Sequence, residues 1–268
     1  MKHIDGISLK DVQDVYSGPE GRLWELVMGQ QIHVGGMTSS MDLAKSAGIA
    51  AGSSGVDLCC CTGAGMRFLV RMCGVGRMIG VDATPAVIDL GRRRNAEEGL
   101  ADRIDFVQAD VCRTGLPAGQ ADFVWGEDAW CYVADKSALI AEAVRLVRPG
   151  GTIAFTDWVE GPTPMSDQEA QRLLRFMKFP SLASLQDYQA LLETHGCAVT
   201  TRFTGRFASH VDLYLDMLTM QLTYDALRII GFDQSLMQHL AGEMQFLQML
   251  AHAGKIEQGL VVATKSEG

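Results

Sequence analysis

The sequence predicts an α/β protein with a doubly wound, mostly parallel sheet of seven strands. From about residue 55, short β-branched runs alternate with helical stretches, as in βαβ units on a parallel sheet. The chain has 268 residues, of which 47% are hydrophobic, so it can fill a sizeable core. Helical patterns before the sheet and before its last strand predict a helical cap formed by these two regions.

The predicted strands are short runs rich in β-branched residues, at 55–59, 78–81, 104–108, 123–126, 152–157, 198–201 and 260–264. One helix is expected to begin at Pro85 with Thr84 as its N-cap and to end at Gly99. A second helix begins near Asp135 and stops before the Arg148-Pro149-Gly150-Gly151 segment, and a third spans 185–194. Residues 1–52 are expected to form an N-terminal helical segment, 53–204 the core, 205–258 a helical pair inserted as a cap, and 259–268 the final strand.

The composition argues against several classes of partner. The net charge is −9 and no run of lysine or arginine could follow a phosphate backbone, so nucleic acid is not expected. No apolar stretch is long enough to span a membrane, and the N-terminus lacks the layout of a signal peptide. We therefore expect a cytoplasmic protein that is a monomer or a homodimer.

The chain contains seven cysteines, three of them consecutive at Cys59, Cys60 and Cys61. Adjacent residues of an extended strand point to opposite faces, and no CxxC pair is present, so these thiols are expected to be reduced and to bind no metal.

Three acidic residues, Asp57, Asp82 and Asp110, lie toward the carboxyl ends of successive predicted strands. The first strand leads into a turn with Gly63 and Gly65, where backbone N–H groups and a helix N-terminus favour an anionic ligand group. Asp82 ends the second strand, where a carboxylate can accept both hydroxyls of a ribose. Asp110 follows the third strand. Open α/β sheets bind ligands at this edge, so the three positions predict a nucleotide-like ligand.

These motifs resemble those of class I methyltransferases that use S-adenosylmethionine (SAM). The segment 57–65 is similar to the first SAM loop, the segment 122–128 to the fourth motif, and the segment 146–151 to the turn before strand five. The resemblance implies a Rossmann-like core that binds SAM as its cofactor through Asp57, Cys59, Cys61, Gly63, Asp82, Ala83, Asp110, Val111 and Glu127. Cys59 and Cys61 depart from the family, which usually has glycine there.

A narrower resemblance is to methyltransferases of the sarcosine/dimethylglycine type. It is carried by the segments 24–36, 125–129 and 179–184 and by Tyr188, although Cys131 stands where those proteins often have histidine. The resemblance implies a small-molecule methyl acceptor that is an amine, such as a glycine or sarcosine derivative. The alternative is an O- or C-methyltransferase of a natural-product-like molecule, favoured by the methionine-rich insertion and by Cys131.

Methyl transfer depends mainly on holding the acceptor atom in line with the methyl group. Asp128 and Asp157, after the fourth and fifth strands, are candidates to orient the acceptor or take its proton. His33 is a candidate base or positioning group, and Tyr16 a residue that closes over the donor. Aromatic side chains that attract cationic amines are expected at the acceptor position, with Trp125 nearby: Trp130, Tyr132 and Trp158.

Two other classes stay open. An NAD-dependent oxidoreductase would share the acid after the second strand, but the first turn lacks the GxGxxG pattern. A non-catalytic SAM-binding module is suggested by Cys59 and Cys61.

Overall fold

The structure, a computed structural model, describes residues 1–267 and contains a seven-stranded sheet with the order β4-β3-β2-β5-β6-β9-β8. The β5–β6 pair and the pairs that join β4, β3, β2 and β5 are parallel, whereas β9 runs antiparallel to both β6 and β8. The α/β class with a mostly parallel seven-stranded sheet is therefore confirmed. The strands are β2 (Ser54–Leu58), β3 (Arg77–Asp82), β4 (Ile104–Gln108), β5 (Ala121–Glu127), β6 (Val147–Glu160), β8 (Cys197–Phe203) and β9 (Ile256–Lys265).

The direction of winding reverses at β2. From β2 the chain moves outward through β3 to β4, and then returns to place β5 on the other side of β2. Such a switch point leaves a crevice at the carboxyl ends of the strands, where open α/β sheets bind their ligands. Asp57 near the end of β2 and Glu127 at the end of β5 lie beside this crevice.

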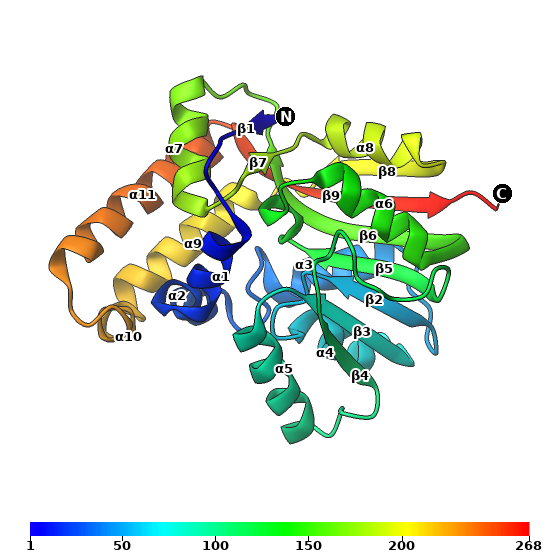
Figure 1. The fold of residues 1–268 in the computed structure, drawn as a ribbon. Coiled ribbons are helices and arrows are strands. Elements are labelled where there is room, and N and C mark those ends of the chain that lie inside the picture. Colours follow the sequence, from blue (N-terminus) through cyan, green and yellow to red (C-terminus); the bar gives the residue numbers. More distant parts are fainter. Residues whose placement is uncertain (268) are drawn as a thin grey trace.

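Helices cover both faces of the sheet (Figure 1). Alternating strand residues face opposite sides: Val124 packs in the cluster that includes α6 and α8, whereas Phe123 and Trp125 pack in the cluster that includes α3, α4 and α5. These helices are α3 (Gly36–Ser46), α4 (Ala64–Met72), α5 (Pro85–Glu97), α6 (Lys136–Leu146) and α8 (Leu185–Thr194).

The remaining helices gather beside the sheet, to its left in Figure 1. The insertion between β8 and β9 forms three helices, α9, α10 and α11, rather than the expected pair. Two of them, α9 and α10, contact α2 in the N-terminal region. A third hydrophobic cluster joins α7, α9 and α11 to the end of β6. These helices are α1 (Leu9–Ser17), α2 (Pro19–Met28), α7 (Asp167–Met177), α9 (Phe207–Met220), α10 (Thr223–Ile229) and α11 (Gln234–His252). None of the helices within residues 1–267 combines the length and apolar character needed to cross a membrane.

Several predicted boundaries need correction. The segment 148–151 is not a turn between elements but lies within β6, opposite an irregularity between Ala121 and Phe123. Thr84 is the N-cap of α5, yet its side chain makes no capping hydrogen bond. β9 begins at Ile256 rather than at residue 259. Helix α7 was not predicted, although its Ser166 and Glu169 form a reciprocal capping box. A short pair, β1 (Lys2–His3) with β7 (Ser181–Leu182), also lies outside the prediction.

Candidate functional site

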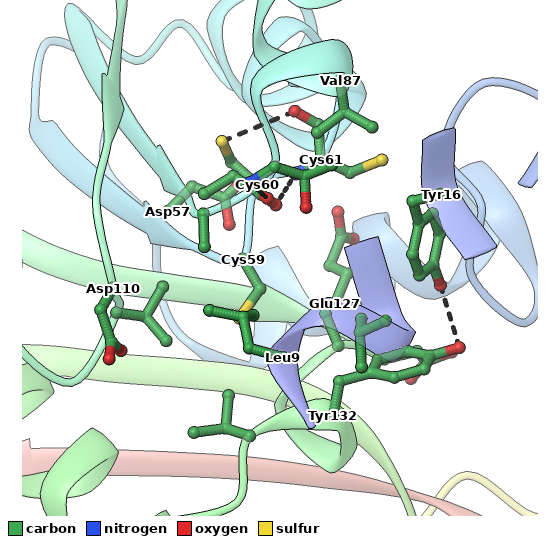
Figure 2. A pocket seen from close by; sticks show the side chains of 18 of the residues that line it. Leu9, Tyr16, Asp57, Cys59, Cys60, Cys61, Val87, Asp110, Glu127 and Tyr132 are labelled. Carbon is green, nitrogen blue, oxygen red and sulfur yellow. Dashed lines mark hydrogen bonds between the residues drawn. The ribbon is translucent and has the colours of Figure 1, made fainter. Parts of the chain in front are cut away.

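A cavity of about 700 Å³ opens at the carboxyl ends of β2, β3, β4 and β5 (Figure 2). This volume lies in the range of small-molecule and cofactor sites. The strand ends form one wall, and α1 lies across the opposite side, where Leu9 and Tyr16 face inward (Figure 2). The cavity brings together most of the predicted site residues: Tyr16, Asp57, Cys59, Cys61, Asp82, Ala83, Asp110, Val111, Glu127, Asp128 and Tyr132.

The loop after β2 turns sharply through left-handed backbone. Cys59 has φ 65°, Cys61 φ 47° and Gly63 φ 75°, so the expectation of adjacent cysteines on an extended strand is wrong. Left-handed backbone favours glycine, which explains why the related motif has glycine where this chain has Cys59 and Cys61. The turn directs the Cys61 N–H to the Asp82 carboxylate at 3.0 Å. The loop therefore keeps its left-handed backbone although cysteine, rather than glycine, stands at positions 59 and 61.

Gly65 lets the Glu127 side chain approach the start of α4. A Cβ built on Gly65 would lie 2.3 Å from Glu127 Oε2, so no larger residue fits without moving this carboxylate. Glu127 Oε1 accepts a hydrogen bond from the Ser40 hydroxyl at 2.6 Å, and the His33 ring lies against the same pair. The carboxylate is thus held in one orientation at the cavity wall.

The cavity is strongly acidic. Burial, followed by the neighbouring charges of Glu127 and Asp82, raises the pKa of Asp57 well above its ordinary value. Burial also raises the pKa of Asp82, opposed by the backbone hydrogen bonds from Thr84 and Cys61. Among the described lining residues, the one cationic side chain is Arg113, which follows Asp110 after β4. Such an environment favours a ligand that brings positive charge and hydroxyl donors.

Asp128 joins three parts of the chain. It follows β5 with left-handed φ 51°, and its carboxylate accepts hydrogen bonds from the Val34 N–H at 2.8 Å and from the side chain of Gln258 on β9 at 2.8 and 3.0 Å. Burial raises its pKa. The bonds tie the segment after α2 to the sheet.

The two tyrosines predicted near the reacting end of the site contact each other. The hydroxyls of Tyr16 and Tyr132 are 2.9 Å apart, and their rings meet edge to face at 5.5 Å. Burial raises the pKa of Tyr16 well above its ordinary value, so this hydroxyl stays protonated at neutral pH. The pair closes one end of the cavity (Figure 2).

Five predicted site residues do not line the cavity: His33, Gly63, Trp130, Asp157 and Trp158. Trp130 is fully buried, where its ring stacks on Phe155 and its N–H reaches the Leu58 carbonyl oxygen. Trp158 packs edge-on between Phe179 and Phe207. Both are core residues rather than acceptor contacts. Trp130 lies in the short helical turn after β5 and Trp158 lies within β6, and the sequence does not reveal which way either side chain turns. Trp125 is likewise in the core.

Asp157 and His33 lie behind the cavity wall. Burial raises the pKa of Asp157 to about 6, while its oxygens accept hydrogen bonds from the Tyr188 hydroxyl at 2.5 Å and from the Cys131 N–H at 3.1 Å. His33 is fully buried and lies 3.0 Å from the Ser40 hydroxyl. Neither side chain reaches the cavity as the prediction required. Gly63 instead shapes the turn, where a Cβ would meet the Phe106 ring at 2.6 Å.

The sequence interpretation missed the lining residues outside the strand ends. They include residues of α1 and the segment before it, the segment after α2, and the first turn of α5: Ile7, Ser8, Leu9, Val12, Gln30, Gln31, Ile32 and Val87. A signal for the α1 group was present, because Ser8 and Asp11 form a capping box that fixes where the helix begins.

Comparisons with known proteins identify similar methyltransferases. Residues 56–155 match the family described as "Methyltransferase domain". Dimethylglycine N-methyltransferase of Parasynechococcus marenigrum is 33% identical over 111 residues, which cover 40% of this chain and 38% of the relative. The chloroplastic probable tocopherol O-methyltransferase of Oryza sativa subsp. japonica is 25% identical over 201 residues, which cover 64% of this chain and 55% of the relative. The match therefore spans about half or less of these relatives' lengths.

A solved structure shares the fold over nearly the whole chain. Phosphoethanolamine N-methyltransferase 2 of Haemonchus contortus, in complex with phosphomonomethylethanolamine and S-adenosylhomocysteine, superposes with a TM-score of 0.85 at 18% identity. The superposition covers 97% of this chain and 61% of that one. The chain as a whole thus shares the fold of this solved methyltransferase. Its matched segment, residues 56–155, is a methyltransferase domain.

Proposed function

We propose that the chain transfers the methyl group of SAM to a small-molecule acceptor in the cavity at the strand ends. The observation that carries the proposal is the acidic lining: six carboxylic acids surround the cavity against one arginine, Arg113. SAM carries a sulfonium, an ammonium and a carboxylate group as well as two ribose hydroxyls, so its net positive charge and its hydroxyls complement this lining. SAM supplies an electrophilic methyl group that needs no covalent intermediate with the protein.

Each part of the cavity fits a part of this cofactor. Asp82 lies at the end of β3, where its carboxylate is available to ribose hydroxyls while it holds the Cys61 N–H. Glu127 lies against Gly65, and its charge acts on Asp57. We assign these two acids to the cationic amino end of the cofactor. Asp110 lies on the opposite side of the view from Tyr16 in Figure 2, and Val111, the next residue, also lines the cavity. We assign both residues to the adenine.

The acceptor would lie toward Tyr16 and Tyr132, and these residues would hold it in line with the methyl group. The Tyr16 hydroxyl can donate a hydrogen bond to an acceptor oxygen, or orient a lone pair, but it does not act as a base while it is protonated. The oxygens of Asp128 already accept N–H groups from Val34 and Gln258, so we assign it a positioning role rather than that of a general base.

The charge of the cavity bears on the acceptor class. Glycine and sarcosine derivatives carry a carboxylate, and the one lining cation, Arg113, lies beside Asp110 rather than beside Tyr16. The carboxylate of such an acceptor would add a second ligand carboxylate to that of SAM, among acids and without a cationic partner of its own. We therefore place an uncharged acceptor methylated on oxygen or carbon ahead of the amine expected from the sequence. We also propose that the sheet and its flanking helices form the SAM-binding core. The N-terminal helices and the helices between β8 and β9 would then form a cap over it.

The test is methyl transfer from SAM with a labelled methyl group to a panel of acceptors, run with the wild-type chain and with Tyr16→Phe. Glycine, sarcosine and dimethylglycine form one arm, and uncharged alcohols, phenols and activated carbon acids form the other. We expect label in the uncharged arm alone. Label in a glycine derivative would overturn the acceptor assignment, and SAM binding without label in any arm would favour a non-catalytic module.

A further inference from the structure

A chain of buried polar groups lies behind the cavity wall, and no step of the proposed methyl transfer uses it. It runs from His33, in the segment after α2, through Ser40 on α3 to the Glu127 carboxylate at the end of β5. His33 and Ser40 are fully buried, and neither lines the cavity. Buried polar groups lower stability unless they are hydrogen-bonded, so a connected chain of them is a costly feature to keep.

The partners of the Ser40 hydroxyl fix the direction of each hydrogen bond in this chain. A serine hydroxyl carries one proton, and its shortest contact is the one to Glu127 Oε1 at 2.6 Å. The Gln31 amide donates to Ser40 Oγ at 2.9 Å. Since the one Ser40 proton is directed to the carboxylate, His33 Nε2, at 3.0 Å, donates to Ser40 as well. Two donors therefore polarise the hydroxyl toward Glu127.

The two oxygens of Glu127 have different surroundings. Oε1 receives the Ser40 hydroxyl and lies 3.4 Å from His33 Nε2. Oε2 lies over the start of α4, where a Cβ on Gly65 would be 2.3 Å away. Within residues 1–267, Ser40 is the one hydrogen-bond donor to this carboxylate, and it reaches Oε1 only. Because Glu127 lines the cavity, Oε2 is the oxygen left for a ligand.

The backbone just before His33 is strained. Ile32 has φ 50°, in the left-handed region that a β-branched residue rarely adopts. Ile32 and Gln31 line the cavity, whereas His33 turns into the interior. Such strain persists where the surrounding structure demands it, and it is concentrated at functional sites. Here it places Ile32 in the cavity wall and the next side chain against Ser40.

We propose that His33, Ser40 and Gln31 position Glu127 so that its free oxygen receives the ammonium group of the cofactor. The inference rests on the proposed SAM site and adds the residues that select ligands with an amino-acid end. Holding Oε1 in advance removes the rotamer freedom that a free glutamate would lose on binding, which increases affinity. His33 and Ser40 act through Glu127, so they are positioning residues rather than bases.

The test compares three ligands by calorimetry. S-adenosylhomocysteine has the whole amino-acid end, S-adenosyl-3-thiopropylamine keeps the amine but lacks the carboxylate, and 5′-methylthioadenosine lacks both. They are titrated into the wild type, Ser40→Ala and His33→Leu. Ser39→Ala is the matched control, because the neighbouring Ser39 hydroxyl is also buried but has no hydrogen-bond partner among the described residues.

We expect Ser40→Ala and His33→Leu to weaken the two ligands that carry an amine by about fivefold, the effect of one hydrogen bond. Both variants should bind 5′-methylthioadenosine as the wild type does, and this binding also shows that each variant is folded. Ser39→Ala should change none of the three affinities. His33→Gln keeps an N–H donor for Ser40, so it should restore most of the loss.

The Glu127→Gln variant separates positioning from a general effect on the fold. In that background Ser40→Ala should cause no further loss, because the charge that Ser40 orients is absent. Equal losses for all three ligands, or unchanged S-adenosylhomocysteine binding in Ser40→Ala, would overturn the positioning role and leave the SAM site standing. A wild type that does not bind S-adenosylhomocysteine would instead contradict the proposed function, and this inference with it. If His33→Leu does not fold, Ser40→Ala decides the outcome alone.

Discussion

Cys59 and Cys61 show how a single residue type can depart from a motif without changing its backbone. Both have positive φ, and a residue with a Cβ in left-handed backbone costs about 1 to 2 kcal/mol relative to its relaxed conformation. The loop is held in place by the Cys61 N–H bond to Asp82 and by the Cys59 and Cys60 N–H bonds to the Val81 carbonyl oxygen. The strain is therefore offset by bonds to β3.

Replacing Cys61 by glycine should relieve this strain. We expect Cys61→Gly to raise the free energy of unfolding by about 0.5 to 1 kcal/mol, because relief of the left-handed backbone exceeds the added entropy of the unfolded chain. Cys60→Gly is the matched control: Cys60 is buried, and its φ is not positive, so the same change should destabilise by about 1 to 2 kcal/mol. Urea unfolding of both variants measures this. Equal destabilisation would show that the left-handed strain is not relieved by glycine.

The buried acid Asp157 predicts a pH dependence of stability. Burial raises its pKa to about 6, opposed by the charge of Lys136 and the hydrogen bond from Tyr188, and further raised by the charge of Asp128. The folded protein therefore holds this proton up to a higher pH than the unfolded chain, whose Asp has the ordinary value of 3.8. The contribution of Asp157 to the free energy of unfolding is therefore fully present below about pH 4, and it is lost as the pH rises to about 6.

Asp157→Asn should remove that contribution. Between pH 4 and pH 6, the free energy of unfolding of the wild type should fall relative to that of the variant, by at most about 1.4 kcal/mol per pH unit. Above pH 6 the difference should no longer change. Urea unfolding at several pH values measures the difference. A difference that does not change with pH would mean that Asp157 titrates alike in the folded and unfolded states.

At the scale of elements, α1 is fastened over the cavity by contacts from its polar side. The Gln13 amide donates to the carbonyl oxygen of Ala83 at 2.8 Å, directly after β3. The segment after α2 is held in place as well, because Arg67 on α4 donates a hydrogen bond to the Gln30 side chain at 3.1 Å. These bonds place the N-terminal segment against the strand ends that line the site.

We expect Gln13→Ala to weaken S-adenosylhomocysteine binding by about 1 kcal/mol, roughly fivefold, because it removes one bond that keeps α1 closed. Lys10→Ala on the same helix is the control, since Lys10 makes an exposed pair with Asp14 that adds little stability. Calorimetry measures the affinity of both variants for S-adenosylhomocysteine. Equal affinities in the two variants would mean that the Ala83 bond does not hold α1 over the ligand.

The elements that the sequence predicted well are those with a strong local signal. The strand at 104–108 and the helix at 185–194 have the expected bounds, because β-branched runs and capping residues act over a few positions. The inserted helices were predicted as a pair, since the break after Met220 contains neither proline nor glycine. The orientation of Trp130 and Trp158 was not predictable, because it depends on packing against residues distant in the sequence, such as Phe155 and Phe207.

At the scale of the whole molecule, the chain has an acidic cavity at the strand ends and an apolar groove lined by residues of α1, α2, α7, α9, α10 and α11. The cavity followed from the sequence, since the acids at the ends of successive strands must meet at one edge of a parallel sheet. The groove did not, because its walls come from separate helices whose relative positions the sequence does not give.

The proposed SAM site is tested most directly by calorimetry of S-adenosylhomocysteine binding to the wild type, to Asp82→Ala and to Asp102→Ala. Asp102 is an exposed acid outside the cavity and serves as the control. We expect binding to the wild type and to Asp102→Ala, and a loss of about 1.5 to 3 kcal/mol in Asp82→Ala from the missing charged hydrogen bonds to the ribose. Normal binding to Asp82→Ala, or no binding to the wild type, would contradict the proposed site.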